Sequence, residues 1–332
     1  MSKNLILSCP PVSDERVEQM KAGIEQWLNT PSLHMLVEGF AGSVPEGLGV
    51  YDLAKWFLDF SDTWDFRGRQ KQAFDGKVGE GVRWLLSSDD LADEQKQAAL
   101  SAGLALGLMG NDTPALESYD YIWVLGGAKL SCLLRSRLAR QTAENAGALP
   151  KAVVMLASMR PIGDGEREAT DTYAPGAGTE FDLFAAAAKI EFGVDDDFTE
   201  ERYDDSDNAN NSWNVRKYLA NGFDLYIIAA PSSEPEKRRA NSADTYEFFF
   251  DYFKAEEGAE ILLATSQIYV PYQHMEAVRT IAIPHRINFD TIGFVPEWGG
   301  DLQGMNEPSN YLQEIRSTIQ AIDRFLAQYA EG

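Results

Sequence analysis

The chain has 332 residues, of which 44% are apolar and 24% are charged, which fits a globular protein of roughly two domains and excludes disordered, collagen-like and disulfide-scaffold chains. Its 29 basic and 52 acidic side chains leave a net charge of −23, which argues against binding to nucleic-acid phosphates or anionic membranes. The two cysteines, Cys9 and Cys132, match no metal spacing and leave room for one disulfide bridge at most, so we expect a reducing compartment. We find neither an export signal pattern nor an apolar stretch long enough to span a membrane, and therefore expect a cytoplasmic protein.

The first third of the chain predicts a helical region. Apolar residues recur there at helical spacing, and no run typical of a buried strand appears after the first few residues. The sequence Asn-Asp-Thr-Pro at 111–114 is typical of a turn. We therefore expect a helical region at 1–115 and a second domain at 116–332. The predicted helices of the first region cover 13–29, 51–60, 78–86 and 92–108.

The remainder predicts an α/β sheet. Short apolar runs without alternation, typical of strands covered on both faces, alternate with segments of helical periodicity. This order favours a doubly wound, mainly parallel Rossmann-like sheet with right-handed crossovers. The connection at 158–224 is long, which makes it an insertion and a candidate lid over a ligand. The predicted strands are 121–125, 152–157, 225–230, 261–265 and 288–294, and the predicted helices are 130–146, 179–190, 210–220, 239–255, 270–281 and 307–330.

Ligands of open parallel sheets bind beyond the carboxyl ends of the strands, so the residues after each run are candidates. Gly126 and Gly127 follow the first run and allow the backbone to turn tightly against a ligand, or merely join strand to helix. Arg160 and Arg239 follow the second and third runs, where a guanidinium group can pair with an anion; the alternative is a solvated charged loop. We expect the ligand between the first and third strand ends.

Further polar residues follow the third and fourth runs. Asn241 and Thr245 would cap a helix or reach a ligand. Glu180 and His274 are the candidate catalytic acids or bases, although His274 fits a packed imidazole equally well. Histidine and cysteine spacing indicates no metal site, and acidic runs such as 195–197 are typical of a solvated face. The predicted ligand-binding residues are Gly126, Gly127, Arg160, Arg239, Asn241, Thr245, Thr265 and Ser266.

The order of these short motifs resembles the YdcF-like family over roughly 119–294. The resemblance implies a Rossmann-like fold and a nucleotide-like ligand, with S-adenosylmethionine as one possible cofactor, near Gly126, Gly127, Arg239, Asn241 and Thr265. It implies no reaction. Tyr269 and Tyr272 depart from the family, which often has a histidine and an arginine there. The motifs that carry the resemblance are Val124-Leu125-Gly126-Gly127, Arg135 or Arg137, Gly178-Thr179-Glu180 with Gly193-Val194, Arg239-Ala240-Asn241 with Thr245, and Ala264-Thr265-Ser266.

Three functions are consistent with these features. The leading hypothesis is a protein that binds an anionic or nucleotide-type small molecule at the strand ends, without nucleic-acid or membrane partners. The second is a metal-assisted hydrolase of phosphate or other esters that uses Glu180 or His274. The third is a non-enzymatic protein whose helical region docks a partner through Trp56, Trp64 and Trp84, which would otherwise pack in a core.

Overall fold

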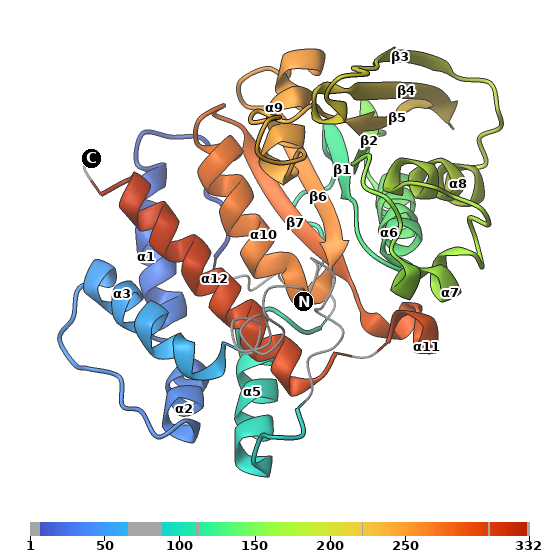
Figure 1. Cartoon of the computed structure of the whole chain (residues 1–332). Coiled ribbons are helices and arrows are strands. Elements are labelled where there is room, and N and C mark those ends of the chain that lie inside the picture. Colours follow the sequence, from blue (N-terminus) through green and yellow to red (C-terminus); the bar gives the residue numbers. More distant parts are fainter. Residues whose placement is uncertain (1–6, 66–87, 111–112, 221, 305, 331–332) are drawn as a thin grey trace. The chain divides into compact units, whose positions relative to one another are not determined.

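The computed structural model describes residues 7–65, 88–110, 113–220, 222–304 and 306–330. The chain divides into two compact units (Figure 1). Unit 1 comprises Met1–Asp112, Gln267–Arg279 and Met305–Gly332, and unit 2 comprises Thr113–Ser266 and Thr280–Gly304. Unit 1 therefore includes two segments that the sequence analysis assigned to the second domain.

Unit 1 is built from helices. The closing helix α12 packs against α3, α5 and α10, and it is buried along most of its length, from Tyr311 to Phe325. Trp64 is fully buried against Phe40 and Phe60, as expected for a core residue. The predicted helix 78–86 and Trp84 lie outside the described residues. The helices among the described residues of unit 1 are α1 (Arg16–Leu28), α2 (Pro31–Gly39), α3 (Val50–Phe60), η1 (Ser61–Trp64), α5 (Asp93–Ala105), η5 (Gln267–Tyr269), α10 (Val270–Ala277) and α12 (Pro308–Gln328).

Unit 2 contains a seven-stranded sheet in the order β3-β4-β5-β2-β1-β6-β7. The central strands β5, β2, β1, β6 and β7 are parallel, which confirms the predicted Rossmann-like α/β fold. All five predicted strands are present, and unbroken apolar runs identified four of them, β1, β2, β5 and β6. The strands are β1 (Tyr121–Leu125), β2 (Ala152–Ala157), β3 (Thr199–Tyr203), β4 (Trp213–Ala220), β5 (Phe223–Ala229), β6 (Glu260–Ser266) and β7 (Asn288–Phe294).

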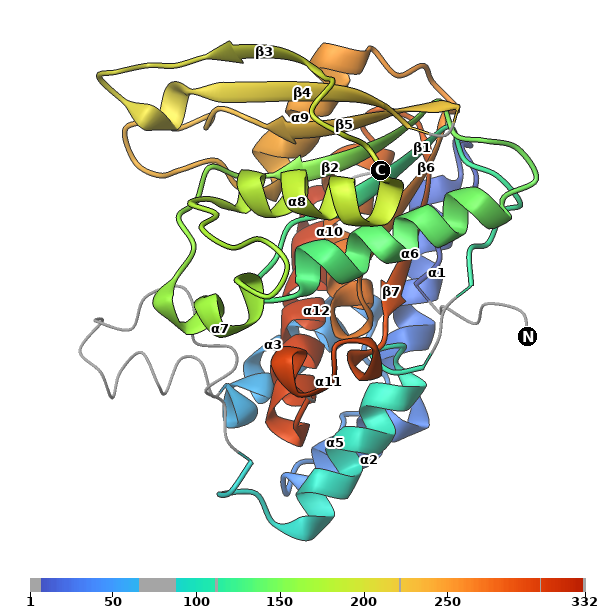
Figure 2. The same cartoon turned by 90° about the vertical axis from the view of Figure 1, so that its right-hand side faces the viewer.

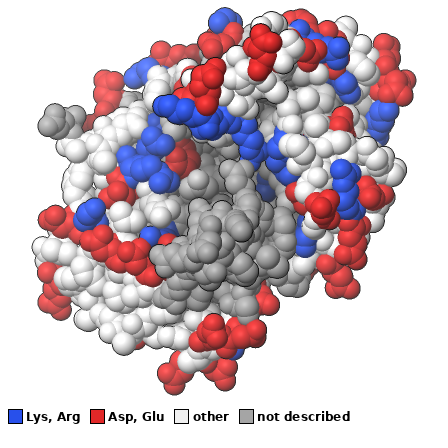
Figure 3. Space-filling view, in the orientation of Figure 1, with Lys and Arg blue, Asp and Glu red and all other residues white. Residues whose placement is uncertain are grey.

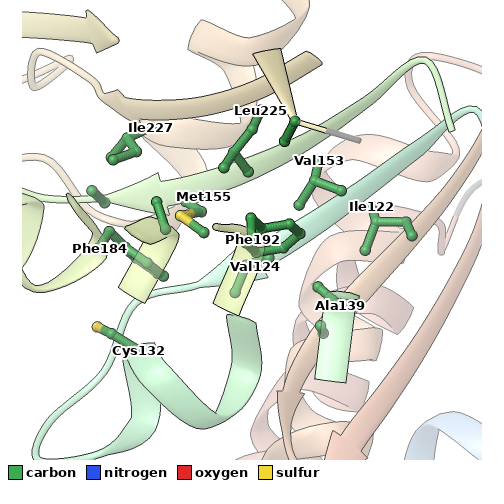
Figure 4. Packing of buried hydrophobic residues seen from close by; sticks show 14 of the residues in the cluster. Ile122, Val124, Cys132, Ala139, Val153, Met155, Phe184, Phe192, Leu225 and Ile227 are labelled. Atoms are coloured by element: carbon green, nitrogen blue, oxygen red, sulfur yellow. The ribbon is translucent and has the colours of Figure 1, made fainter. Parts of the chain in front are cut away.

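Helices cover both faces of this sheet. Figure 2 shows α6 (Ser131–Asn145) and α8 (Glu180–Phe192) on one face and α9 (Ser242–Phe253) on the other. Side chains of the central strands pack against α6 and α8 in one continuous core (Figure 4). Aromatic residues of α9 pack on the opposite face, where the ring of Trp123 stacks on that of Tyr246 with the ring centroids 5.1 Å apart. The shorter helical segments of unit 2 are η3 (Asp164–Glu166), α7 (Arg167–Thr170), η4 (Ala209–Asn211), η6 (Val278–Ala282, which begins in unit 1), η7 (Pro296–Trp298) and α11 (Gly300–Gln303).

The predicted helix at 210–220 is wrong, because these residues form β4 after the short turn η4. β4 pairs antiparallel with β5 and with β3, a strand that the sequence analysis did not predict. β3 is an edge strand of mostly exposed polar residues, so it lacks the apolar run that identified the others. The insertion at 158–224 thus extends the sheet as well as carrying helices.

The strand order also corrects the expected ligand position. β2 separates β1 from β5, so the first and third predicted strands are not neighbours. The direction of winding reverses between β1 and β6, which pair directly. In a doubly wound sheet this reversal is where a ligand crevice opens, at the carboxyl ends of the two strands. Gly126 follows one of these strands, and Ser266 ends the other.

The described residues include neither a helix that could span a membrane nor a disulfide bridge. No helix among them is both long enough and apolar enough to cross a lipid bilayer. Cys9 and Cys132 are both free thiols, so the structure contains no bridge between them.

Candidate functional site

The turn after β1 accommodates a carboxyl group. A Cβ atom on Gly126 would lie only 1.5 Å from Oε1 of Glu180, so no other residue fits at this position without displacing that side chain. The glycine therefore allows close approach, as the sequence analysis proposed, but the approaching group belongs to the protein itself. Glu180 is 6% exposed and comes from the first turn of α8.

The local sequence determines the position of Glu180. Thr179 is the N-cap of α8 and forms a capping box with Asp182, in which the Thr179 hydroxyl accepts from the Asp182 amide and the Asp182 carboxylate accepts from the Thr179 amide. The segment before the helix folds back on the residues that follow β2 through an isolated bridge between Pro161 and Thr179, and the Glu180 amide donates to the carbonyl of Arg160 at 3.1 Å. These contacts place the start of α8 at the carboxyl edge of the sheet.

One oxygen of the Glu180 carboxyl is fixed and the other is not. Oε2 accepts from Nε of Arg160 at 2.6 Å and from the Ser158 hydroxyl at 3.3 Å. Oε1 accepts no hydrogen bond from the described residues. Burial raises the pKa of the Glu180 carboxyl in spite of the opposing charge of Arg160.

Arg160 is neutralised within the protein. Its Nη1 and Nη2 donate to the two carboxylate oxygens of Glu166 at 2.8 and 3.0 Å, a bidentate pair, while Nε is bonded to Glu180. Nη2 also donates to the carbonyl of Gly127 at 3.1 Å. The expectation that Arg160 supplies net positive charge to an anionic ligand is therefore not supported by its contacts, because two carboxylates already balance it. Its observed role is to hold Glu180 against the turn.

Arg135 joins the turn after β1 to the end of β6. It donates to the carbonyls of Leu125 and Gly126, and to the hydroxyl of Ser266 through Nε at 3.3 Å and Nη2 at 3.0 Å. A Cβ on Gly127 would lie 2.7 Å from the Cβ of Ser131 and 3.2 Å from Nη1 of Arg135. Gly127 and Ser266 thus lie in one polar cluster, and the neighbouring Thr265 is fully buried.

The predicted residues after β5 form hydrogen bonds with one another. Asn241 is the N-cap of α9, with its side chain accepting from two backbone amides, and the Thr245 hydroxyl donates to the Asn241 carbonyl at 3.2 Å. Asp244 pairs with Arg238, and bonds from Arg238 and nearby amides outweigh burial and lower its pKa to about 2. Arg239 is exposed at the start of this segment. Helix capping accounts for the observed contacts of the Asn241 side chain, and the Thr245 hydroxyl is bonded to a backbone carbonyl of the same helix start.

Other basic side chains are also paired with carboxylates. Lys237 and Arg238 both pair with Glu234, and Figure 3 shows basic side chains lying beside acidic ones over much of one face. The described residues contain no group of three histidine, cysteine, aspartate or glutamate side chains that could hold a metal ion. His274, the second catalytic candidate, is buried in unit 1, whereas Glu180 belongs to unit 2.

Several residues of the cluster were not identified from the sequence. Glu166 and Ser158 carry no motif, and they reach Arg160 and Glu180 only because the segment from 161 to 179 folds back on itself. Ser131 occupies an unremarked helix start. The positions of Ser158 and Ser131, directly after β2 and after the turn that follows β1, were the available signal, since those places collect ligand-binding groups.

Comparison with known proteins corrects the family resemblance. A model of the Rv3785 N-terminal domain matches residues 12–107. Over 337 positions the chain is 32% identical to Uncharacterized protein Rv3785 of Mycobacterium tuberculosis and to Uncharacterized protein Mb3814 of Mycobacterium bovis, covering 96% of this chain and 93% of each relative. No solved structure matches the chain.

The resemblance to the YdcF-like family is therefore wrong, because these matches point to a different family. The motifs behind it, a glycine turn and polar strand ends, are features that many Rossmann-like sheets share. The inference of S-adenosylmethionine depended on that resemblance and is withdrawn with it. The chain is a member of the Rv3785 family.

Proposed function

We propose that this chain binds a small polar molecule at the carboxyl edge of the sheet in unit 2 and exchanges a proton with it through Glu180. The observation that carries the proposal is the asymmetry of this carboxyl group. Oε2 is held by Arg160 and Ser158, while Oε1 accepts no hydrogen bond from the described residues. A general acid or base needs one such oxygen in a fixed place.

The surroundings of Glu180 favour proton exchange. Burial raises the pKa of its carboxyl above the usual value, which brings the protonated and ionised forms closer in free energy near neutral pH. The charge of Arg160 opposes this effect on the pKa and favours the ionised carboxylate. Glu166 keeps Arg160 in place through two parallel hydrogen bonds, so Glu166 serves as a positioning residue.

The other two functions have less support. A metal-assisted hydrolase would need ligands for an ion, and the described residues offer no suitable group of side chains. Trp64 cannot serve as an exposed anchor for a partner of the helical region, since that side chain is fully buried.

The test compares Glu180→Gln with Glu191→Gln. Glu191 lies on the same helix, is 9% exposed and pairs with Arg137 and Arg140, so its variant controls for loss of a buried charge away from the site. Purified protein is examined by native mass spectrometry for bound molecules, and thermal shift is recorded with carboxylic acids, amides and phosphate esters from pH 5 to 8. We expect a compound whose stabilising effect depends on pH in the wild type and in Glu191→Gln, but not in Glu180→Gln. Equal responses of all three proteins would refute the proposal.

A further inference from the structure

Two buried serine hydroxyls flank the turn after β1. Ser131 begins α6 and is 4% exposed, and Ser266 ends β6 and is 7% exposed. The turn and the end of β6 are neighbours because β1 and β6 pair directly at the reversal of the winding direction. Arg135 links the two sides, since it contacts both the turn and Ser266.

Both hydroxyl groups accept hydrogen bonds and keep a proton to donate. Ser266 Oγ accepts from Nε and Nη2 of Arg135, which uses both of its lone pairs. Ser131 Oγ accepts from Nε2 of Gln303 at 3.5 Å. No acceptor within the described ranges lies at hydrogen-bond distance from either hydroxyl proton. Buried polar groups are rarely left unsatisfied, because the loss of hydration is not compensated.

The side chains that contact the two serines do so through donors. The amide nitrogen of Gln303 lies beside Ser131, while its Oε1 is buried without a partner among the residues that the structure describes. The cation of Arg135 lies directly behind Ser266. α6 starts at Ser131 without a side-chain cap, which leaves the positive end of a 15-residue helix on the same side.

We propose that Ser131 and Ser266 bind an oxyanion, a carboxylate or phosphate group, of the molecule that Glu180 acts upon. This inference builds on the proposed function and names its ligand class. Glu180 Oε1 lies against Gly126, whereas Ser131 and Arg135 lie against Gly127, so the two parts of the site are one residue apart on the same turn. Successive Cα atoms are about 3.8 Å apart, and the ligand is therefore a small acid whose reacting proton is close to its anionic group.

The probes are inorganic phosphate and acetate, with acetamide as the neutral analogue of acetate, titrated into the full chain at constant ionic strength and followed by calorimetry. We expect the wild type to bind phosphate, acetate or both, and not acetamide. Binding of phosphate alone identifies a phosphorylated ligand, and binding of acetate alone identifies a carboxylic acid. Ser131→Ala and Ser266→Ala should each weaken binding about tenfold, which corresponds to about 1.4 kcal/mol.

Ser136→Ala is the matched control, because Ser136 is a fully buried serine on α6 whose hydroxyl already donates to the Cys132 carbonyl at 2.7 Å. It should bind the probes as the wild type does. Glu191→Gln should also retain binding. A wild type that binds neither probe but shows the pH-dependent response assigned to Glu180 would overturn this inference and leave the proposed function standing. The inference is overturned if the wild type binds neither anion, or if folded Ser131→Ala and Ser266→Ala proteins, checked by circular dichroism, bind as tightly as Ser136→Ala.

Discussion

Replacing Gly126 by alanine tests the contact on which the site is built. The new Cβ would lie 1.5 Å from Oε1 and 2.5 Å from Cδ of Glu180, so the carboxyl group must move away. Moving it breaks the 2.6 Å hydrogen bond from Arg160. Hydrogen bonds to charged groups contribute about 1.5–3 kcal/mol, and loss of this one leaves a buried carboxyl less well satisfied. We expect Gly126→Ala to lower the free energy of unfolding by about 2–3 kcal/mol.

The assay is urea denaturation followed by circular dichroism, with Gly147→Ala as control. A Cβ on Gly147 would meet Glu117 only at 3.8 Å, which is ordinary van der Waals distance. Glu180→Ala should make room for the new methyl group, so the cost of Gly126→Ala should largely disappear in the double variant, a coupling that a double-mutant cycle measures. If Gly126→Ala is as stable as the wild type, or equally harmful with and without Glu180, the close approach described here is incorrect.

Two further predictions concern titrating groups in unit 2. The pKa of Asp244 is lowered from 3.8 to about 2, so its bonds stabilise the fold above pH 3.8 and this stabilisation is lost as the pH falls toward 2. Asp244→Asn should therefore lower the free energy of unfolding by about 1 kcal/mol at pH 7, after allowance for solvent screening, and have almost no effect near pH 2. Urea denaturation across this pH range measures the difference, and a constant difference would contradict the assignment. Burial raises the pKa of the Cys132 thiol to about 12, so we expect a thiol reagent to modify Cys132 only when unit 2 unfolds. Peptide mass spectrometry follows this reaction, and rapid labelling of Cys132 in the native protein would show that the thiol is accessible.

The local hydrophobic pattern identified the strands that are buried on both faces. Residues 121–125 and 152–157 read as strands because both faces are covered, and the structure places β1 and β2 at those positions. β4 was mistaken for a helix because only Val215, Tyr218 and Ala220 are buried along it, a spacing that does not alternate strictly. Its pairing with β5 and β3 depends on residues far along the chain and is invisible to a local pattern.

The same distinction holds for the site. The position of Gly126 after a parallel strand was enough to place it at the carboxyl edge. What fills the space beside it could not be predicted, since Glu180 and Arg160 approach through the fold of the inserted segment. A cluster of basic residues after a strand likewise says nothing about which carboxylates pair with it. Arg160 and Arg238 both turned out to be paired within the protein.

The burial of α12 against α3, α5 and α10 has a consequence for how the polypeptide is made. A ribosome releases α5 roughly 200 residues before α12, a delay of about 10–40 s at 5–20 residues per second. During that interval the whole of unit 2 can emerge and fold, while the early helices wait with uncovered apolar faces. A recombinant fragment limited to 12–107 would lack α12, so its apolar helix faces would stay uncovered. It should precipitate unless a peptide spanning 306–330 is added.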